Sequence, residues 1–347
     1  MRNLLLSWVL IAMFVSCKKE RPQPTMPTSI KVVASEKLRV FVLNQGVWPI
    51  DNSSVCLYDE KNGLISSDYF KWKNPSKSLG SVPQSMTKIG NHYFLVVNTA
   101  GKVKVLDTTF VQVGEVANLN SPRFAIAAGN NKMYVSDLYA DKITVVNTQD
   151  YSVSKTIKLK GWSEQMCSIN NMVYVCDYDS SKLYGIDTNN DVVTDSISVG
   201  KGAEYMVKDK NNHLWILCTS IFNTEKKYLK CLDVSSKTIL HSFEFSSSES
   251  PTALQINGAG DQLYYINKQV YSMSINSTSL PGSALIQAGA NQNFYALGVN
   301  PENENIYVSE SKSGQAFDHV FVYSKGGEKL TEFESGYFTG YFYFDRK

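Results

Sequence analysis

The sequence is poor in several residue types on which whole classes of protein depend. Its 347 residues include only 6 Cys, 4 His and 10 Pro. So few cysteines in so long a chain exclude the disulfide framework of small secreted domains. The histidines show no metal-ligand spacing, and we therefore expect no metal site; they are His92, His213, His241 and His319. The scarcity of proline leaves long stretches free to form strands.

The chain also lacks net charge and recognisable catalytic motifs. Its 34 basic and 32 acidic residues give a formal charge of +2, so we expect no nucleic-acid partner. No G-x-S-x-G motif or phosphate-binding glycine loop occurs. The run DTNND at Asp187–Asp191 departs from a calcium loop at Val192 and Ser198, which predicts a turn. We expect a protein that is not an enzyme and has no catalytic cofactor, with a lyase or hydrolase of dispersed residues as the alternative.

Long hydrophobic runs are missing except at the N-terminus. The segment MRNLLLSWVLIAMFVSC, residues 1–17, has a basic start and an apolar run too short to span a bilayer. This layout predicts a secretory signal peptide. Ser16-Cys17 resembles a lipobox, with Phe14 in place of Leu, and predicts lipidation of Cys17 and a membrane anchor; the alternative is an ordinary signal with an incidental cysteine. Residues 18–29 read as a flexible tether, and residues 30–347 as one domain.

Five cysteines follow this segment, and an odd number cannot all pair. Cys218 and Cys231 flank one expected strand-loop-strand unit. Two outcomes remain open for them: a disulfide in an oxidising compartment, or two buried thiols that pack within strands.

Aromatic residues are abundant, and they occur in a repeat. The chain has 20 Tyr, 16 Phe and 5 Trp, a composition that favours strands. Residues 130–148 and 170–188, about 40 residues apart, both read as strand, polar loop, strand. Further strand-like runs between these units give four strands per unit, which predicts an all-β, seven-bladed propeller of four-stranded antiparallel blades. The units begin with Leu38–Leu43, Tyr93–Val97, Met133–Ser136, Val173–Cys176, Leu214–Leu217, Leu263–Ile266 and Ile306–Ser309.

The two ends of the repeat complement each other. The first unit lacks an inner strand, whereas GYFTGYFYFD at Gly336–Asp345 reads as an inner strand with nothing after it. We therefore expect the C-terminal strand to join the first blade and close the ring, which removes an open sheet edge.

Three stretches resemble a known family: LNQGVWPIDNSSVCLYD (43–59), SPRFAIA (121–127) and DKNNHLWILC (209–218). They are similar to the YncE-like seven-bladed propellers, and within them to the BtuG-like surface lipoproteins of Bacteroidetes, with Gln45 in place of Glu. The resemblance implies binding of cobalamin or a related corrinoid and its transfer to a TonB-dependent outer-membrane transporter. It also implies a lipid-anchored protein of the outer membrane, exposed at the cell surface. An adhesin or a glycan- or protein-binding module is the alternative.

The propeller geometry indicates where a ligand would bind. The loops joining the two strands of each unit lie on the same face as the starts of the inner strands, and aromatic residues collect there. Rigid rings with polar handles suit a large amphipathic ligand. The predicted ligand-binding residues are Trp48, Arg123, Phe124, Tyr139, Trp162, Glu164, Tyr178, Glu204, Tyr205, Phe222, Phe294 and Tyr337.

Overall fold

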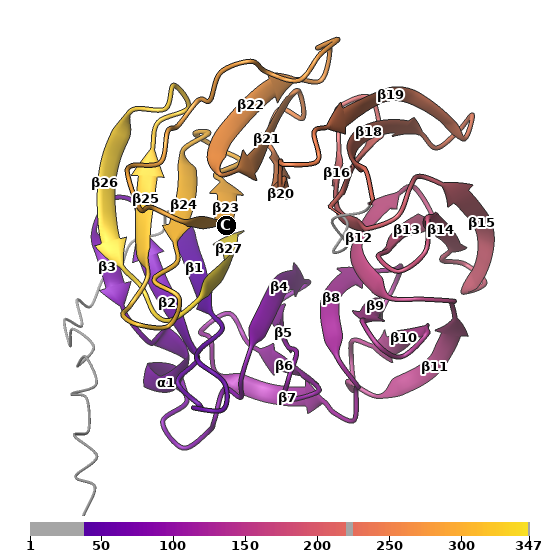
Figure 1. Cartoon of the computed structure of the whole chain (residues 1–347). Helices are drawn as coiled ribbons and strands as arrows, with labels where there is room; N and C mark the ends of the chain where they lie inside the picture. The colour runs from indigo at the N-terminus through magenta and orange to yellow at the C-terminus, as the bar shows by residue number, and fades with distance from the viewer. Residues whose placement is uncertain (1–37, 220–224, 346–347) are drawn as a thin grey trace, which may run out of the picture.

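The computed structural model describes residues 38–219 and 225–345, which form seven antiparallel β-sheets arranged as blades around a central axis (Figure 1). Six of these sheets have four strands and one has three. The seven-bladed propeller predicted from the repeat is therefore confirmed. The predicted signal peptide, the tether and the expected domain start at Ile30 fall outside the described residues.

Each blade begins with an inner strand beside the axis and ends with an outer strand at the periphery (Figure 1). Blade 1 consists of β27 (Thr339–Asp345), β1 (Arg39–Asn44), β2 (Ser54–Asp59) and β3 (Gly63–Ser66). Blade 2 consists of β4 (Pro83–Ile89), β5 (His92–Val97), β6 (Lys102–Leu106) and β7 (Gln112–Val116). Blade 3 consists of β8 (Pro122–Ala127), β9 (Lys132–Asp137), β10 (Lys142–Asn147) and β11 (Val153–Lys158). Blade 4 consists of β12 (Ser163–Ile169), β13 (Met172–Asp177), β14 (Lys182–Asp187) and β15 (Val192–Ser198).

The remaining blades continue the series. Blade 5 consists of β16 (Ala203–Lys208), β17 (Leu214–Cys218), β18 (Lys227–Asp233) and β19 (Thr238–Phe245). Blade 6 consists of β20 (Thr252–Ile256), β21 (Gln262–Asn267) and β22 (Gln269–Ser274). Blade 7 consists of β23 (Phe294–Val299), β24 (Ile306–Glu310), β25 (His319–Tyr323) and β26 (Lys329–Glu334).

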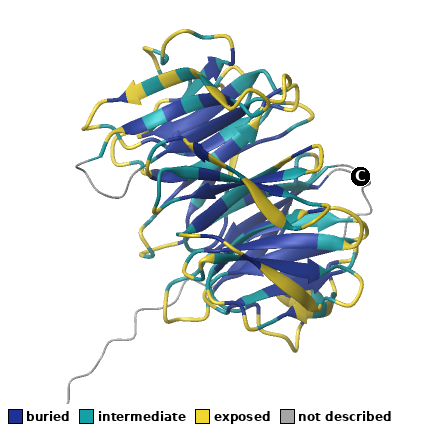
Figure 2. Ribbon diagram, turned by 90° about the vertical axis from the view of Figure 1, so that its right-hand side faces the viewer, coloured by how far each residue is buried: buried dark blue, intermediate teal, exposed yellow. Residues whose placement is uncertain are grey.

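The core lies between neighbouring blades. The second strand of a blade, such as β5 with its sequence HYFLVV, is apolar on both faces because a blade covers each face. One cluster joins Phe94 and Val105 of blade 2 to Met133 of blade 3. Outer strands such as β11 are mostly exposed, and Figure 2 shows this change from buried interior to exposed periphery. Each blade is therefore stabilised by its neighbours.

Blade 6 departs from the expected four strands. In place of a fourth strand, a single β-bridge joins Val270 to Ile286. The preceding segment contains Pro281, which has no N–H to donate, and Gly282, which has no side chain to pack. These two residues account for the missing outer strand.

The described residues also include one short helix and two cysteines whose pairing the sequence left open. A short helix, α1 (Tyr69–Lys73), follows β3 and is capped by Asp68, whose side chain accepts a hydrogen bond from the Lys71 amide at 3.0 Å. Within the described ranges, no helix is long and apolar enough to cross a membrane. Cys218 and Cys231 are both free thiols, which decides between the two outcomes left open by the sequence.

Candidate functional site

All seven inner strands contain a β-bulge near their start. In β4, for example, Pro83 pairs with Val97 and Ser85 with Val96, so that Gln84 between them has no partner. Equivalent register shifts occur in β8, β12, β16, β20, β23 and β27. A bulge turns the extra residue out of the ladder. The bulged position of each blade therefore faces the channel, and in β20 the preceding Thr252 lines it as well.

These residues surround a cavity of about 390 Å³ at the face that carries the loops between the second and third strands of the blades. Six of the seven positions bear a side chain, and the seventh is Gly340 of β27. A Cβ on Gly340 would lie 2.5 Å from Nε2 of Gln45, so the Gln45 side chain from the β1–β2 loop fills the place of the missing one. We call the resulting set the mouth ring: Gln45, Gln84, Arg123, Glu164, Glu204, Thr252 and Tyr295.

Arg123 links three blades of the mouth ring. Its Nε donates to both carboxylate oxygens of Glu164, at 3.0 and 2.9 Å. Its Nη1 donates to Oε1 of Gln84 at 2.6 Å. Because each partner belongs to a neighbouring blade, the guanidinium is held in one orientation.

The two carboxyl groups of the ring have different surroundings. Glu164 is 3% exposed; burial and the charge of Glu204 raise its pKa to about 7, against the opposing effect of Arg123. Glu204 is half-buried and opens into the cavity, and its Oε2 accepts a hydrogen bond from the Thr219 hydroxyl at 2.7 Å. Burial also raises the pKa of Glu204. Glu164 is thus paired with a cation, whereas Glu204 is held by a neutral donor.

Hydroxyl groups complete the mouth ring. Thr252 donates to the Tyr205 hydroxyl at 3.0 Å, and the Tyr295 hydroxyl donates to Oε1 of Gln45 at 3.2 Å. Burial raises the pKa of both Tyr205 and Tyr295, which keeps these phenols neutral. They can therefore both donate and accept hydrogen bonds at the mouth.

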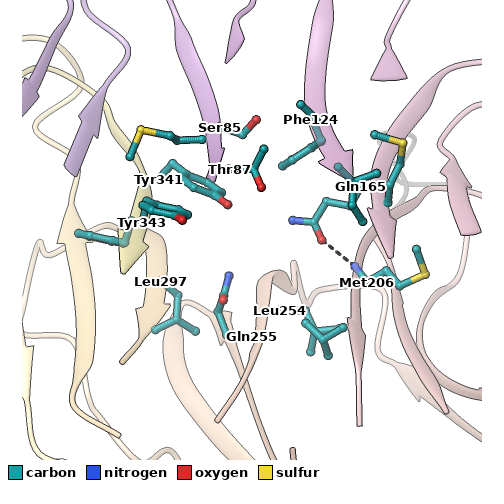
Figure 3. Close-up of a pocket in the computed structure, with 16 residues that line it drawn as sticks. Ser85, Thr87, Phe124, Gln165, Met206, Leu254, Gln255, Leu297, Tyr341 and Tyr343 are labelled. Atoms are coloured by element: carbon teal, nitrogen blue, oxygen red, sulfur yellow. Dashed lines mark hydrogen bonds between the residues drawn. The ribbon is translucent and has the colours of Figure 1, made fainter. Parts of the chain in front are cut away.

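A second cavity, of about 330 Å³, continues the channel below the mouth (Figure 3). Figure 3 shows Tyr341 and Tyr343 facing Phe124 and Gln165 across it, and Oε1 of Gln165 accepts a hydrogen bond from the Met206 amide at 2.8 Å. Its lining has no charged side chain. Both cavities share Phe124, Gln165, Gln255, Leu297 and Tyr341, so they adjoin along the axis.

Three of the predicted aromatic residues form a separate group, which we call the rim stack. Tyr139 and Trp162 meet edge to face with ring centroids 5.3 Å apart, and Trp162 and Tyr178 stack at 6.4 Å. Tyr139 is 58% exposed. None of the three lines either cavity, so the rim stack lies beside the channel over blades 3 and 4.

The other predicted residues are dispersed. Trp48 is 73% exposed at the tip of the β1–β2 loop. Phe294 lines the mouth cavity but is only 5% exposed and belongs to the core between blades 6 and 7. Tyr337 packs edge to face on buried Phe317 at 4.9 Å. Phe222 lies outside the described residues. Of the twelve predicted residues, the mouth cavity gathers Arg123, Phe124, Glu164, Glu204, Tyr205 and Phe294.

Sequence reasoning missed the uncharged polar part of the site. Gln84, Gln165, Thr252 and Gln255 all line the mouth cavity, as does Gln45. An alignment of the inner-strand starts on their shared proline, at Pro83, Pro122 and Pro251, would have found Gln84 and Thr252, since each follows its proline as Arg123 does. These side chains have no ring, so the aromatic pattern of the loops does not mark them.

One cluster of the described residues has the donor atoms for a metal ion, although the histidine spacing predicted none. Asp209, His213 and Cys231 each offer a ligand atom within 4.8 Å of the others, a mixed donor set that suits zinc. Asp209 also accepts hydrogen bonds from the amides of Asn211 and His213, at 2.8 and 2.9 Å, and from Nε1 of Trp215 at 3.1 Å. These bonds close the turn before β17 and account for the arrangement without an ion.

Seven antiparallel sheets form a closed ring around a channel whose opening is lined by polar side chains. This arrangement defines the class of the protein as a seven-bladed β-propeller with a candidate ligand site on one face. More particularly, the chain belongs to the family described as a domain of unknown function, DUF5074, whose model matches residues 39–345. No curated protein matches the sequence significantly.

Solved structures share the fold at low identity. A quinoprotein alcohol dehydrogenase-like protein from Bacteroides thetaiotaomicron is 15% identical with a TM-score of 0.71, over 88% of this chain and 77% of that one. The dihydro-heme d1 dehydrogenase NirN is 10% identical with a TM-score of 0.60, over 93% and 78%. Hydrazine synthase of Kuenenia stuttgartiensis is 14% identical with a TM-score of 0.55, over 68% and 74%. Such similarity establishes the propeller and carries no activity across.

Proposed function

We propose that this protein is a binding propeller whose mouth ring captures cobalamin or a related corrinoid without changing it chemically. The observation that supports the proposal is the composition of the mouth ring. It presents the amides of Gln45 and Gln84 together with charged and hydroxyl groups around one opening. A corrinoid carries carboxamide arms around a flat macrocycle, and primary amides are both donors and acceptors for such groups.

The dimensions support a ligand that covers the mouth. The cavity of about 390 Å³ is too small for a whole corrinoid, so its carboxamide arms would enter while the macrocycle lies across the opening. The neutral phenols of Tyr205 and Tyr295 offer apolar ring surface with a polar end there. The uncharged lining of the inner cavity then receives no charged group from the ligand.

Calorimetry with the soluble protein lacking residues 1–17 tests the proposal. We expect stoichiometric binding of cobalamin, weakened about tenfold by Gln84→Ala through the loss of one buried amide contact. Gln112→Ala removes an amide from outer strand β7 of the same blade and is the matched control. Absence of heat and of any mobility shift with cobalamin or cobinamide would exclude this function. Recovery of the ligand unchanged, checked by mass spectrometry, separates binding from a lyase or hydrolase activity.

The proposal includes a location and a partner. Lipidated Cys17 would anchor the propeller to the outer membrane through a tether, with the mouth ring free to pass its ligand to a TonB-dependent transporter. In intact cells we expect external protease to remove the propeller, and Cys17→Ser to release it from the membrane fraction. Protection from external protease would place it on the periplasmic side instead.

The rim stack favours a second function, recognition of a glycan or a host protein. Aromatic rings such as exposed Tyr139 and half-buried Trp162 bind flat apolar faces at little entropic cost. Because this group lies outside both cavities, Trp162→Ala separates the two functions. It should abolish binding on a glycan array under the second function and leave cobalamin binding within about twofold under the first.

A further inference from the structure

The charges at the mouth do not balance. Arg123, Glu164 and Glu204 are the charged residues that line the mouth cavity, and the inner cavity has none. Arg123 is 2.9 Å from Glu164 and pairs with it. Glu204 forms no ion pair with a described residue, although the charge of Arg123 acts on it from a distance, and it receives hydrogen bonds from the hydroxyls of Thr219 and Tyr205. One carboxylate at the mouth therefore has no cation in direct contact with it.

The position of Glu204 makes this charge available to a ligand. Glu204 is half-buried, whereas Glu164 is only 3% exposed. Glu204 also borders the cavity at the bulge of β16. The hydroxyl groups that donate to Glu204 are neutral, so they do not cancel the negative charge of its carboxylate. A half-buried carboxylate that faces a cavity with no cation beside it favours a partner with N–H donors and disfavours a second anion.

We propose that Glu204 determines the ligand class of the mouth ring, by accepting hydrogen bonds from a cationic or carboxamide N–H group and by excluding ligands that place a carboxylate there. This inference rests on the proposed function. If the ligand is a corrinoid, Glu204 accepts a hydrogen bond from one of its uncharged carboxamide arms. Arg123 directs its donors to Glu164 and Gln84, so a ligand group at Glu204 meets that carboxylate without a cation beside it.

A pair of probes that differ by one group tests the inference: cobalamin and its monocarboxylic acids, in which one peripheral carboxamide is hydrolysed to a carboxylate. Calorimetry at pH 7.5 compares both with the wild-type protein and with Glu204→Gln, a change that keeps the shape and removes the charge. We expect the wild type to bind the monocarboxylate that reaches Glu204 at least about tenfold more weakly than cobalamin. In Glu204→Gln the two affinities should agree within about twofold, since the repulsion is gone.

The matched control is Glu244→Gln, on exposed outer strand β19 of the same blade, where Glu244 pairs with Lys226. It should retain the wild-type discrimination, and circular dichroism melting checks that both variants fold. If every monocarboxylate binds as tightly as cobalamin to the wild type, or if Glu204→Gln discriminates as strongly as the wild type, the inference is wrong while the proposed function stands. Binding of neither probe to the wild type would overturn both.

Discussion

Arg39, at the start of β1, forms an ion pair with Asp345, at the end of β27, with 2.5 Å between Nη2 and Oδ2. The same carboxylate accepts hydrogen bonds from the Tyr93 hydroxyl at 2.7 Å and from Nζ of Lys88 at 3.0 Å. The Asp345 side chain is 0% exposed. The last strand of the ring is thus bound to its own blade and to blade 2 through one buried carboxylate.

Replacing this carboxylate should destabilise the ring. Asp345→Asn leaves Arg39 and Lys88 without their counter-charge, and we expect the free energy of unfolding to fall by about 3 kcal/mol. Urea denaturation measures the change. Glu332→Gln, which breaks the exposed pair with Lys329, is the control and should have no measurable effect.

The effect of Asp345→Asn should depend on pH. Although burial acts in the opposite direction, hydrogen bonds from Tyr93, Arg39 and Lys88 hold the pKa of Asp345 below its usual value of 3.8. A lowered pKa contributes stability that is present above the unfolded-state value and lost as pH falls through the folded-state value. The difference between wild type and Asp345→Asn should therefore be constant above about pH 5 and shrink below pH 3.8. A difference that persists unchanged to pH 2 would contradict this account.

Removal of the closing strand should affect the whole domain. Deletion of residues 337–347 takes away β27, which pairs with β1 and also lines both cavities. It leaves blades 1, 2 and 7 with exposed apolar faces, because Phe342 and Tyr343 pack against them. We expect loss of the single cooperative melting transition. Deletion of residues 346–347 alone is the control, and an unchanged midpoint in the longer deletion would refute ring closure.

Gly340 should be required for the mouth ring more than for stability. A Cβ there would displace the end of the Gln45 side chain, 2.5 Å away, and break its hydrogen bond with Tyr295. Since a flexible side chain gives way, Gly340→Ala should change the free energy of unfolding by less than ~1 kcal/mol. Cobalamin affinity should fall about tenfold. Gly282→Ala, at a site with open space, is the control, and unchanged affinity in Gly340→Ala would exclude a role for Gln45.

Glu164 should make stability depend on pH in the neutral range. Burial, aided by Glu204 and opposed by Arg123, raises its pKa from 4.5 to about 7. A raised pKa gives stability that is complete below the unfolded-state value and lost as pH rises through the folded-state value. Relative to Glu164→Gln, the wild type should therefore lose about 3 kcal/mol between pH 4.5 and 8, measured by urea denaturation. A pH-independent difference would show that Arg123 keeps Glu164 ionised throughout.

The number of blades and the closure of the ring were predictable from local pattern. Strands such as Tyr93–Val97 are apolar throughout because neighbouring blades cover both faces, and that requirement repeats in every unit. Blade 6 was predicted less well. Where a fourth strand was expected, Ile286 forms only one bridge, since Pro281 and Gly282 interrupt the outer edge.

The candidate site was predictable in part. Arg123, Glu164 and Glu204 were found because each starts an inner strand, and strand direction places those starts on one face. The positions of aromatic residues in the sequence were a poorer guide to which side chains line the channel. Phe294 packs into the core, and Trp162 belongs to a stack beside the channel, because the direction of a ring depends on what neighbouring blades leave open.

The sequence by itself determined the repeat, the strand directions and the face that carries the site, because these follow from side-chain alternation and from the need of each blade to bury both faces. Tertiary structure decided which side chains meet. The bulges shift the register by one residue and turn residues such as Gln84 and Glu164 into the channel. The ring also brings Gln45 from the β1–β2 loop over Gly340 and leaves Glu204 without an ion pair among the described residues, which only the closed circle of seven blades determines.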